Sequence, residues 1–446
     1  MMLDKGNLSL LAEGLERLED GFKDLPQVDA PVDRKGIREV ILEIAEAMQD
    51  NYPYFHPFYA GQMLKPPHPV ARLAYMLSMW INPNNHALDG GRASSRMEKD
   101  AVSQIARMFG WSTHLGHLCG GGTMANLEAL WVSGRLKPET RIVASRQAHY
   151  THDRITHVLG LPFTAIACDD KGRMDTAALG EVLKGGDVGT VVVTMGTTAT
   201  GAVDPLADIC RLQETYGFRI HADAAYGGYF VLSDRLDEET RRHFDAIGQA
   251  DSIAVDPHKH GLQPYGCGCI LFKDPAVGAL YKHDSPYTYF SSDDLHLGEI
   301  SLECSRAGAA AVALWATQRL MPLVPDGEFA RNLDDCRRAA VRLGDKITAS
   351  PNFMLSLIPE LDIVVWAPIG ETASAVSTRS VRIFNALAER GIHLAVARLP
   401  REIFGHAWSH VRWDQDQVTC LRSCLMKPEH LDWVDTIWER VQEVAG

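Results

Sequence analysis

One lysine in this sequence stands where a lysine is costly to place. Lys259 lies between His258 and His260, shortly after the apolar run at 252–255. A buried ammonium group resists desolvation, so burial lowers its pKa. The neutral amine that results is a nucleophile toward aldehydes, with which it forms a Schiff base. The position of Lys259 therefore indicates covalent chemistry with a carbonyl group.

A carboxylate ends a second apolar run. Asp223 closes the stretch "FRIHAD", whose remaining residues are typical of a buried strand. A buried carboxylate without a cation tends to protonate, so something positive must face it. That partner is either a side chain, such as His221 or an arginine, or the protonated ring nitrogen of a bound cofactor.

Glycines and hydroxyls supply a third kind of group. Residues 120–122 are glycines that precede Thr123 and a helix-forming run, and Thr198 ends the "GTT" that follows another apolar run. A helix N-terminus behind glycines favours phosphate, although the same pattern also serves as a tight turn with Thr123 as the N-cap. Together with Lys259 and Asp223, these residues match what pyridoxal 5'-phosphate requires: phosphate donors, a carboxylate for the ring nitrogen and an amine for the aldehyde.

Two groups of metal-binding residue types give an alternative interpretation. His149, His152 and His157 follow a predicted strand, with Asp153 nearby, and would suit a metallohydrolase. No HExxH or HxxEH spacing accompanies them, however, which favours one functional histidine or none. Cys267 and Cys269 share one face of a predicted strand and form a weaker metal candidate, so we expect no metal site.

Composition narrows the class of protein. The chain has 446 residues, a formal net charge of −13 and nine scattered cysteines. Without a basic run, nucleic acid and anionic membranes are not expected as partners. No signal peptide and no apolar stretch long enough for a membrane span are evident, and the unpaired thiols favour a reducing compartment. We therefore expect a cytoplasmic protein.

The pattern of elements predicts an α/β fold. Amphipathic helical stretches alternate with short β-branched runs between about 100 and 275, which is typical of a mostly parallel central sheet with helices on both faces. We predict an N-terminal helical segment at 1–65, a large domain at 66–322 and a small C-terminal α+β domain at 323–446.

Several of these stretches resemble a known family. The strings "HADAAYGG", "DSIAVDPHK", "QAHY" and "GTT" closely resemble those of the group II pyridoxal-phosphate-dependent amino acid decarboxylases, and the resemblance covers roughly 50–430. It implies a fold-type-I, aminotransferase-like enzyme that acts as a homodimer, with the active site at the subunit interface and dimer contacts in the N-terminal segment.

The resemblance also implies roles for individual residues. Lys259 would form the Schiff base, Asp223 would pair with the pyridine nitrogen, and His149 would stack on the ring. The remaining cofactor contacts would be Gly122, Thr123, Ser252 and His258 at the phosphate, Thr198 near the ring and Ala225 on its other face.

Proton transfer and substrate recognition are implied on other segments. Tyr287 or Tyr289 would protonate the product carbon from a loop. The segment with His56, Phe58 and Tyr59 would form an aromatic wall. Arg422 would bind the substrate carboxylate unless it forms a surface ion pair with Glu429 or a neighbour. His260 departs from the family, which usually has a bulky apolar or aromatic residue after the lysine; it serves either loop hydrogen bonding or the entrance.

The expected reaction is decarboxylation of an L-amino acid to its amine and CO2, with an aromatic substrate such as tyrosine favoured. Acidic or aliphatic substrates remain alternatives. A second outcome on the same scaffold is oxygen-dependent conversion to an aldehyde, ammonia and peroxide. A further alternative is a protein that binds the cofactor but does not turn over a substrate. The presence of both Lys259 and Asp223 argues against it.

Overall fold

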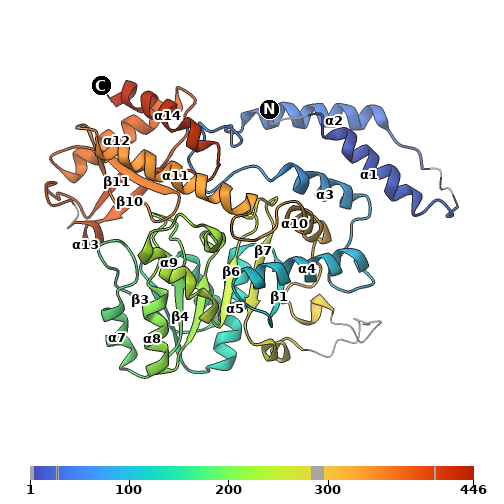
Figure 1. The fold of residues 1–446 in the computed structure, drawn as a ribbon, viewed down its shortest axis with the longest axis horizontal. Coiled ribbons are helices and arrows are strands. Elements are labelled where there is room, and N and C mark those ends of the chain that lie inside the picture. The colour runs from blue at the N-terminus through green and yellow to red at the C-terminus, as the bar shows by residue number, and fades with distance from the viewer. Residues whose placement is uncertain (1–4, 27, 29, 283–295, 406–407, 446) are drawn as a thin grey trace.

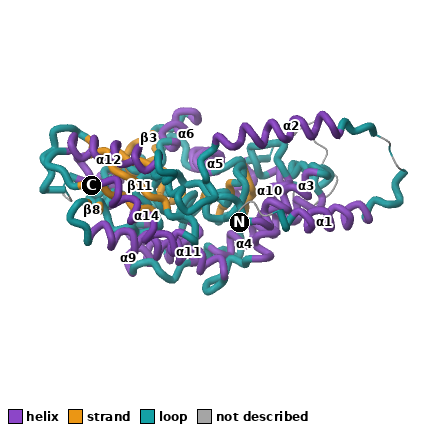
Figure 2. The backbone as a smooth tube through the Cα atoms, turned by 90° about the horizontal axis from the view of Figure 1, so that it is seen from above, coloured by secondary structure: helices purple, strands orange, loops and turns teal. Residues whose placement is uncertain are grey.

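The computed structural model describes residues 5–26, 28, 30–282, 296–405 and 408–445. Two helices at the N-terminal end, α1 (Leu8–Asp20) and α2 (Arg34–Ala47), extend away from the rest of the molecule (Figures 1 and 2). No residue of α2 is buried within this chain. No helix in the described part of the chain has the length and apolar character needed to cross a bilayer.

A seven-stranded sheet forms the centre of the molecule, in the order β1-β7-β6-β5-β4-β2-β3. Its strands are parallel except β7, which runs antiparallel to both neighbours. Their bounds are β1 Leu115–Cys119, β2 Arg141–Ser145, β3 Phe163–Ile166, β4 Val188–Thr194, β5 Arg219–Asp223, β6 Ser252–Val255 and β7 Gly268–Phe272. The predicted mostly parallel sheet is confirmed.

Helices cover both faces of this sheet because successive strand residues point to opposite sides. Val191 and Val193 of β4 pack in one apolar cluster with Leu206, whereas Val192 packs in another with Leu130. The helices around the sheet are α3 (Pro69–Met79), α4 (Arg92–Met108), α5 (Gly122–Leu136), α6 (Thr151–Leu159), α7 (Thr176–Leu183), α8 (Leu206–Tyr216), α9 (Glu238–Asp245) and α10 (Gly308–Leu320).

A second, antiparallel sheet follows in the order β10-β11-β9-β8, and it confirms the predicted C-terminal α+β architecture. Its strands are β8 Phe353–Leu355, β9 Ile363–Pro368, β10 Ala395–Pro400 and β11 Gln417–Cys424. The accompanying helices are α11 (Glu328–Thr348), α12 (Ala373–Ala388), α13 (Arg401–Phe404) and α14 (His430–Ala445). Short 3-10 helices lie at Met48–Asp50, Gly228–Leu232, Ile247–Gln249, Pro275–Leu280 and Leu297–Glu299.

The predicted divisions of the chain fall between elements. The division after residue 65 precedes α3, and the division after residue 322 lies between α10 and α11. Whether these segments are separate domains stays a prediction.

β1 and β3 were not expected from the sequence. The "LGHLC" of β1 contains a glycine and a histidine, so its strand pattern is weak, and pairing with β7 fixes it.

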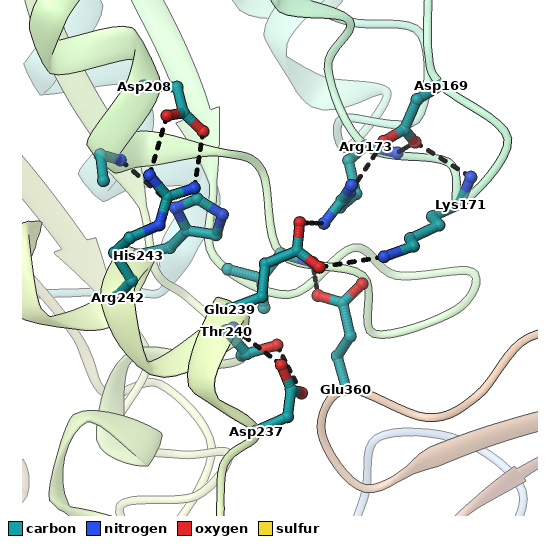
Figure 3. A network of polar contacts seen from close by, with 12 residues as sticks. Asp169, Lys171, Arg173, Asp208, Asp237, Glu239, Thr240, Arg242, His243 and Glu360 are labelled. Carbon is teal, nitrogen blue, oxygen red and sulfur yellow. Dashed lines mark hydrogen bonds and ion pairs between the residues drawn. The ribbon is translucent and has the colours of Figure 1, made fainter.

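A polar network on the surface joins distant segments (Figure 3). Arg173 pairs with Asp169 at 2.8 Å and with Glu239 of α9 at 2.8 Å, and Lys171 pairs with the same Glu239 at 3.0 Å. Glu360, from the segment before β9, lies beside Glu239 and accepts a hydrogen bond from the backbone N–H of Val203 at 2.9 Å. The network therefore ties the second sheet to the loops of the first.

Candidate active site

A cavity of about 550 Å³ opens at the carboxyl ends of β4, β5 and β6, next to the N-terminus of α5. Ligands of parallel α/β sheets bind outside the carboxyl ends of the strands, because loops and helix N-termini meet there. The cavity is lined by Gly120, Gly121, Gly122, Thr123, Met124, Asn126, Leu127, His149, Thr151, Thr194, Gly196, Thr198, Asp223, Ala225, Tyr226, Asp256, His258, Lys259 and Tyr265.

Asp223 is the last residue of β5 and is 5% exposed. Its Oδ2 accepts hydrogen bonds from His152 Nε2 at 2.8 Å and Asn126 Nδ2 at 3.2 Å. Burial alone would raise the pKa of Asp223, but the hydrogen bond from His152 and the nearby cationic groups hold the pKa well below its usual range. Asp223 is therefore a permanent carboxylate at the edge of the cavity.

A second layer of side chains holds this arrangement. His221 bonds Asn126 Oδ1 through Nε2 at 2.8 Å and Ser252 Oγ through Nδ1 at 2.9 Å. Burial lowers the pKa of His221 to about 3, so its ring is neutral. The sequence left His221 as one alternative partner for Asp223; instead His221 orients Asn126, which in turn donates to the carboxylate.

Lys259 enters the cavity from the turn after β6. Its Nζ lies 3.0 Å from Oδ2 of Asp256, a carboxylate that is buried and whose Oδ1 has no described partner. Asp256 thus pairs with the amine and holds it at the cavity, where an aldehyde would react with it.

The glycine cradle leaves room for a ligand. A Cβ on Gly122 would lie 2.8 Å from Asp256 Oδ2 and 3.2 Å from the Ala225 Cβ, and Gly121 has a φ of +149°. The first N–H groups of α5 have no partner within the helix and open toward the cavity. His258 stands beside Gly121; its Nδ1 donates to the Cys267 carbonyl at 2.8 Å, and its Nε2 lies 3.6 Å from Asp256 Oδ2.

These groups fit pyridoxal 5'-phosphate. Thr194 Oγ1, on the cavity lining, is buried without a described partner, as is Asp256 Oδ1. Buried polar atoms without partners are rare, and a bound polar molecule would satisfy them. A carboxylate, an amine and free N–H groups at the start of a helix surround the same cavity.

A comparison with known families decides the identity. The sequence model described as the pyridoxal-dependent decarboxylase conserved domain matches residues 124–367, more than half of the chain. This protein is a pyridoxal-dependent decarboxylase. Its cofactor is therefore pyridoxal 5'-phosphate, and its activity is that of an amino acid carboxy-lyase.

Individual relatives agree with this family. An L-tyrosine decarboxylase of Enterococcus faecium is 27% identical, over 69% of this chain and 66% of the relative. A probable L-tyrosine/L-aspartate decarboxylase of Methanothermobacter thermautotrophicus is 29% identical, over 69% of this chain and 82% of the relative. The crystal structure of Oryza sativa TDC with PLP and tryptamine shares the fold, with a TM-score of 0.79, 16% identity and full coverage of both chains.

Most of the predicted cofactor contacts of this decarboxylase lie together on the cavity lining. His149 is half-buried, and burial lowers its pKa, which favours the neutral ring suited to stacking. Its Nδ1 accepts a hydrogen bond from the Thr151 hydroxyl at 2.7 Å. Thr198 and Ala225 line the cavity from the ends of β4 and β5.

Other predicted site residues lie elsewhere. Ser252 is at the opposite end of β6, buried against His221, so the geometry assigns it to that histidine and not to the cavity. His56 and Phe58 contact the Trp433 ring, with centroids 4.9 and 5.1 Å apart, and Tyr59 packs beside His393. None of these three lines the cavity within this chain.

Arg422 also lies off the cavity. It is buried in β11, opposite Val365 of β9, and its Nε and Nη2 atoms have no described partner. The alternative interpretation, a surface ion pair with Glu429, is wrong because the side chain is only 4% exposed. Tyr287 and Tyr289 lie outside the described residues.

The histidines considered as metal ligands diverge in this decarboxylase. His149 lines the cavity, His152 turns to Asp223, and His157 is exposed on α6. Cys267 and Cys269 are buried, and burial raises the pKa of both thiols. Among the described residues no three candidate ligands of these types gather in one place.

Sequence reasoning missed several residues of the site. Asp256 stands inside the quoted "DSIAVDPHK", so its carboxylate could have been weighed as a partner for Lys259. His152 was considered only as a metal ligand. No local sequence pattern indicates that this histidine, and not a neighbouring one, points toward Asp223. Tyr226 and Tyr265 also line the cavity.

Proposed function

We propose that this decarboxylase acts on an aromatic L-amino acid, tyrosine first, and releases the corresponding amine. The observation that carries the proposal is the composition of the cavity around Lys259. Its walls include the aromatic Tyr226 and Tyr265 and the apolar Met124 and Leu127, and among the described residues no arginine lines it. An acidic side chain such as that of aspartate would require a further cation there.

The relatives are named for both substrates. The Enterococcus faecium relative is named for L-tyrosine alone and the Methanothermobacter thermautotrophicus relative for L-tyrosine and L-aspartate, whereas a probable L-aspartate decarboxylase of Halobacterium salinarum is 32% identical over 60% of this chain. Aspartate is therefore the second candidate. The aromatic wall expected from His56, Phe58 and Tyr59 does not contribute to this argument, because those rings pack against Trp433 of α14 and against His393.

The proposed roles follow from the positions of the side chains. Bound pyridoxal 5'-phosphate supplies the electron sink that accepts the bonding pair when CO2 leaves. We assign Lys259 to the aldehyde, Asp223 to the ring nitrogen and His149 to the ring face. Gly122, Thr123 and His258 hold the phosphate, with Thr198 and Ala225 beside the ring.

Two carboxylates set the charge around the cofactor. Asp256 Oδ2 pairs with Lys259 Nζ at 3.0 Å, and Asp223 keeps its negative charge because His152 and Asn126 donate to it. The hydrophobic packing behind β5 excludes water from this carboxylate, which strengthens its interaction with a cationic ring nitrogen. Tyr287 or Tyr289 remains the predicted donor of the proton that replaces the carboxylate on the substrate.

The first experiment is CO2 release from cofactor-loaded protein across the L-amino acids, with oxygen uptake recorded in the same vessel. CO2 with tyramine from tyrosine and no oxygen uptake is expected. Turnover of aspartate but not of tyrosine would contradict the substrate assignment. Oxygen uptake with peroxide would replace the amine-forming outcome by the aldehyde-forming one.

The lysine assignment has its own test. Lys259→Ala should remove the visible absorbance of the lysine-bound cofactor and lower turnover by at least about a thousandfold, since the covalent anchor is lost. Absorbance spectroscopy and the CO2 assay measure the two effects. An Ala variant that kept both colour and rate would contradict the assignment of Lys259.

We further propose a homodimer in a reducing, cytoplasmic compartment. The apolar face of α2 supports the dimer, because Ile37, Val40, Ile41 and Ile44 are all more than half exposed in the single chain. The nine cysteines, all free, support the compartment.

A further inference from the structure

A second cavity, of about 470 Å³, lies behind the turn that carries Lys259. It is formed where the segment before α3, the start of α11 and the segment after β11 meet. His260 lines it, whereas the neighbouring Lys259 lines the cofactor cavity. The cavity is therefore separate from the site described above, yet one peptide unit away from its lysine.

Two amines lie on the wall of this cavity. Lys65 Nζ donates to the Met426 carbonyl at 2.9 Å, and Lys427 Nζ donates to the Tyr59 carbonyl at 2.5 Å. An ammonium group has three N–H donors, so each retains donors for a further acceptor. Lys427 is 4% exposed, and Lys65 is half-buried.

Neither amine is neutralised by a carboxylate at ion-pair distance within the described part of the chain. Glu429 lines the same cavity without pairing with either lysine. Burial and the charge of Lys65 lower the pKa of Lys427 to about 7, so this amine is only partly charged near pH 7. An anion bound beside the two amines would pair with their charged forms and raise this pKa, so the cavity favours an anionic occupant.

The rest of the lining mixes apolar and polar groups. Pro66, Leu262, Phe329 and Leu333 supply apolar surface, and the polar side chains are Asn7, His68, Arg72, Asn332 and Glu429. A cationic end next to an apolar body selects an organic anion over an inorganic one, because the inorganic ion leaves the apolar surface uncovered. We propose that this cavity binds a small organic carboxylate, held by Lys65 and Lys427.

The cavity is joined to the cofactor site by a buried chain of polar groups. His260 Nε2 lies 3.2 Å from Asp362 Oδ2, and Tyr226 donates its hydroxyl to Asp362 Oδ1 at 2.6 Å. Tyr226 lines the cofactor cavity. A carboxylate bound beside His260 changes the field at Asp362 and so at Tyr226, which makes the cavity a regulatory site. This inference does not depend on which amino acid is the substrate.

The test is calorimetric titration of the holoenzyme with benzoate, with neutral benzamide as the matched control ligand. One benzoate should bind per chain, and Lys427→Met and Lys65→Met should each weaken binding at least tenfold. Lys184→Met, on the surface, should bind like the unmodified protein. Absence of benzoate binding, or equal binding of benzamide, would overturn the site.

Three further measurements keep the result specific. Benzoate binding that is lost in Lys259→Ala but kept in Lys427→Met would place the ligand in the cofactor cavity and overturn the inference. Binding of inorganic phosphate without binding of benzoate would overturn the carboxylate class. Benzoate should also shift the visible absorbance of the cofactor, and binding with an unchanged spectrum would refute the coupling through Tyr226.

Folding of the variants is checked separately. Lys427→Met removes a buried charge and should leave the unliganded protein at least as stable in thermal unfolding. Benzoate should raise the unfolding temperature of the unmodified protein but not of this variant. If Lys427→Met is instead destabilised, Lys65→Met, at a half-buried position, decides whether benzoate binds to the amines.

Discussion

At the scale of single residues, the charge of Asp223 depends on a contact between distant parts of the chain. His152 of α6 reaches the end of β5 and donates to the carboxylate at 2.8 Å. Asn126 of α5 donates as well, and His221 fixes the amide. The carboxylate needed for a cationic ring nitrogen is thus maintained by neighbours and not by Asp223 alone.

Replacing His152 by Leu should raise the pKa of Asp223, because a hydrogen bond to a charged group is lost while burial remains. The pKa of Asp223 should rise by about one unit, the equivalent of about 1.4 kcal/mol, so the acidic end of the kcat/KM profile, where Asp223 begins to protonate, should move upward by the same amount. A pH profile of the decarboxylation rate measures this shift. His152→Gln, which keeps an N–H donor, should restore part of it.

His157→Ala is the matched control, since His157 is exposed on the same helix. Its pH profile should be unchanged. An unshifted profile for His152→Leu would show that His152 does not stabilise the ionised Asp223.

At the scale of elements, Figure 3 shows two links between distant segments: Glu239 of α9 pairs with Arg173, and Glu360, before β9, accepts a hydrogen bond from the Val203 N–H. Burial raises the pKa of Glu360 to about 7, although the Val203 N–H and Arg173 oppose that effect. The unfolded chain releases this proton at lower pH than the folded chain does. The contribution of Glu360 to the free energy of unfolding is therefore lost as the pH rises from about 5 to 7.

Glu360→Gln removes the pH dependence of the free energy of unfolding that Glu360 causes, and it keeps an oxygen that can accept the hydrogen bond from the Val203 N–H. At pH 8 the variant should be more stable than the unmodified protein by about 1–2 kcal/mol, and near pH 5 the two should be equal. Urea unfolding at both pH values measures the difference. A variant that is less stable at pH 8 would mean that Glu360 is ionised and usefully paired in the folded protein.

At the scale of the whole molecule, α2 lacks a partner within the chain. Its apolar residues recur at positions 37, 40, 41 and 44, the spacing of one helical face. Such a face is stable in water only when another surface covers it. The extension of α1 and α2 away from the body leaves this face available to a second copy (Figures 1 and 2).

The double substitution Ile41→Asp with Ile44→Asp should convert the predicted dimer to a monomer, because two charges would be buried in the interface. Sedimentation velocity measures the change in mass. Arg38→Asp, away from the apolar face of the same helix, should remain dimeric. A monomeric unmodified protein, or a double variant that stays dimeric, would contradict this role for α2.

What the sequence determined by itself was the local chemistry. Lys259, Asp223 and the glycines before Thr123 lie in contiguous strings, so their residue types indicated the cofactor and the family without any long-range contact. The alternation of helices and strands likewise predicted the parallel sheet, because periodicity is a property of neighbouring residues.

Only the tertiary structure decided which distant residues meet. It paired His152 with Asp223, Lys259 with Asp256, and brought Lys65 to the same cavity as Lys427. It also turned Ser252, Arg422 and the aromatic segment near Tyr59 away from the cofactor cavity. The physical reason is that strand order and helix packing set these distances, whereas a linear pattern records only which face of its own element a residue occupies.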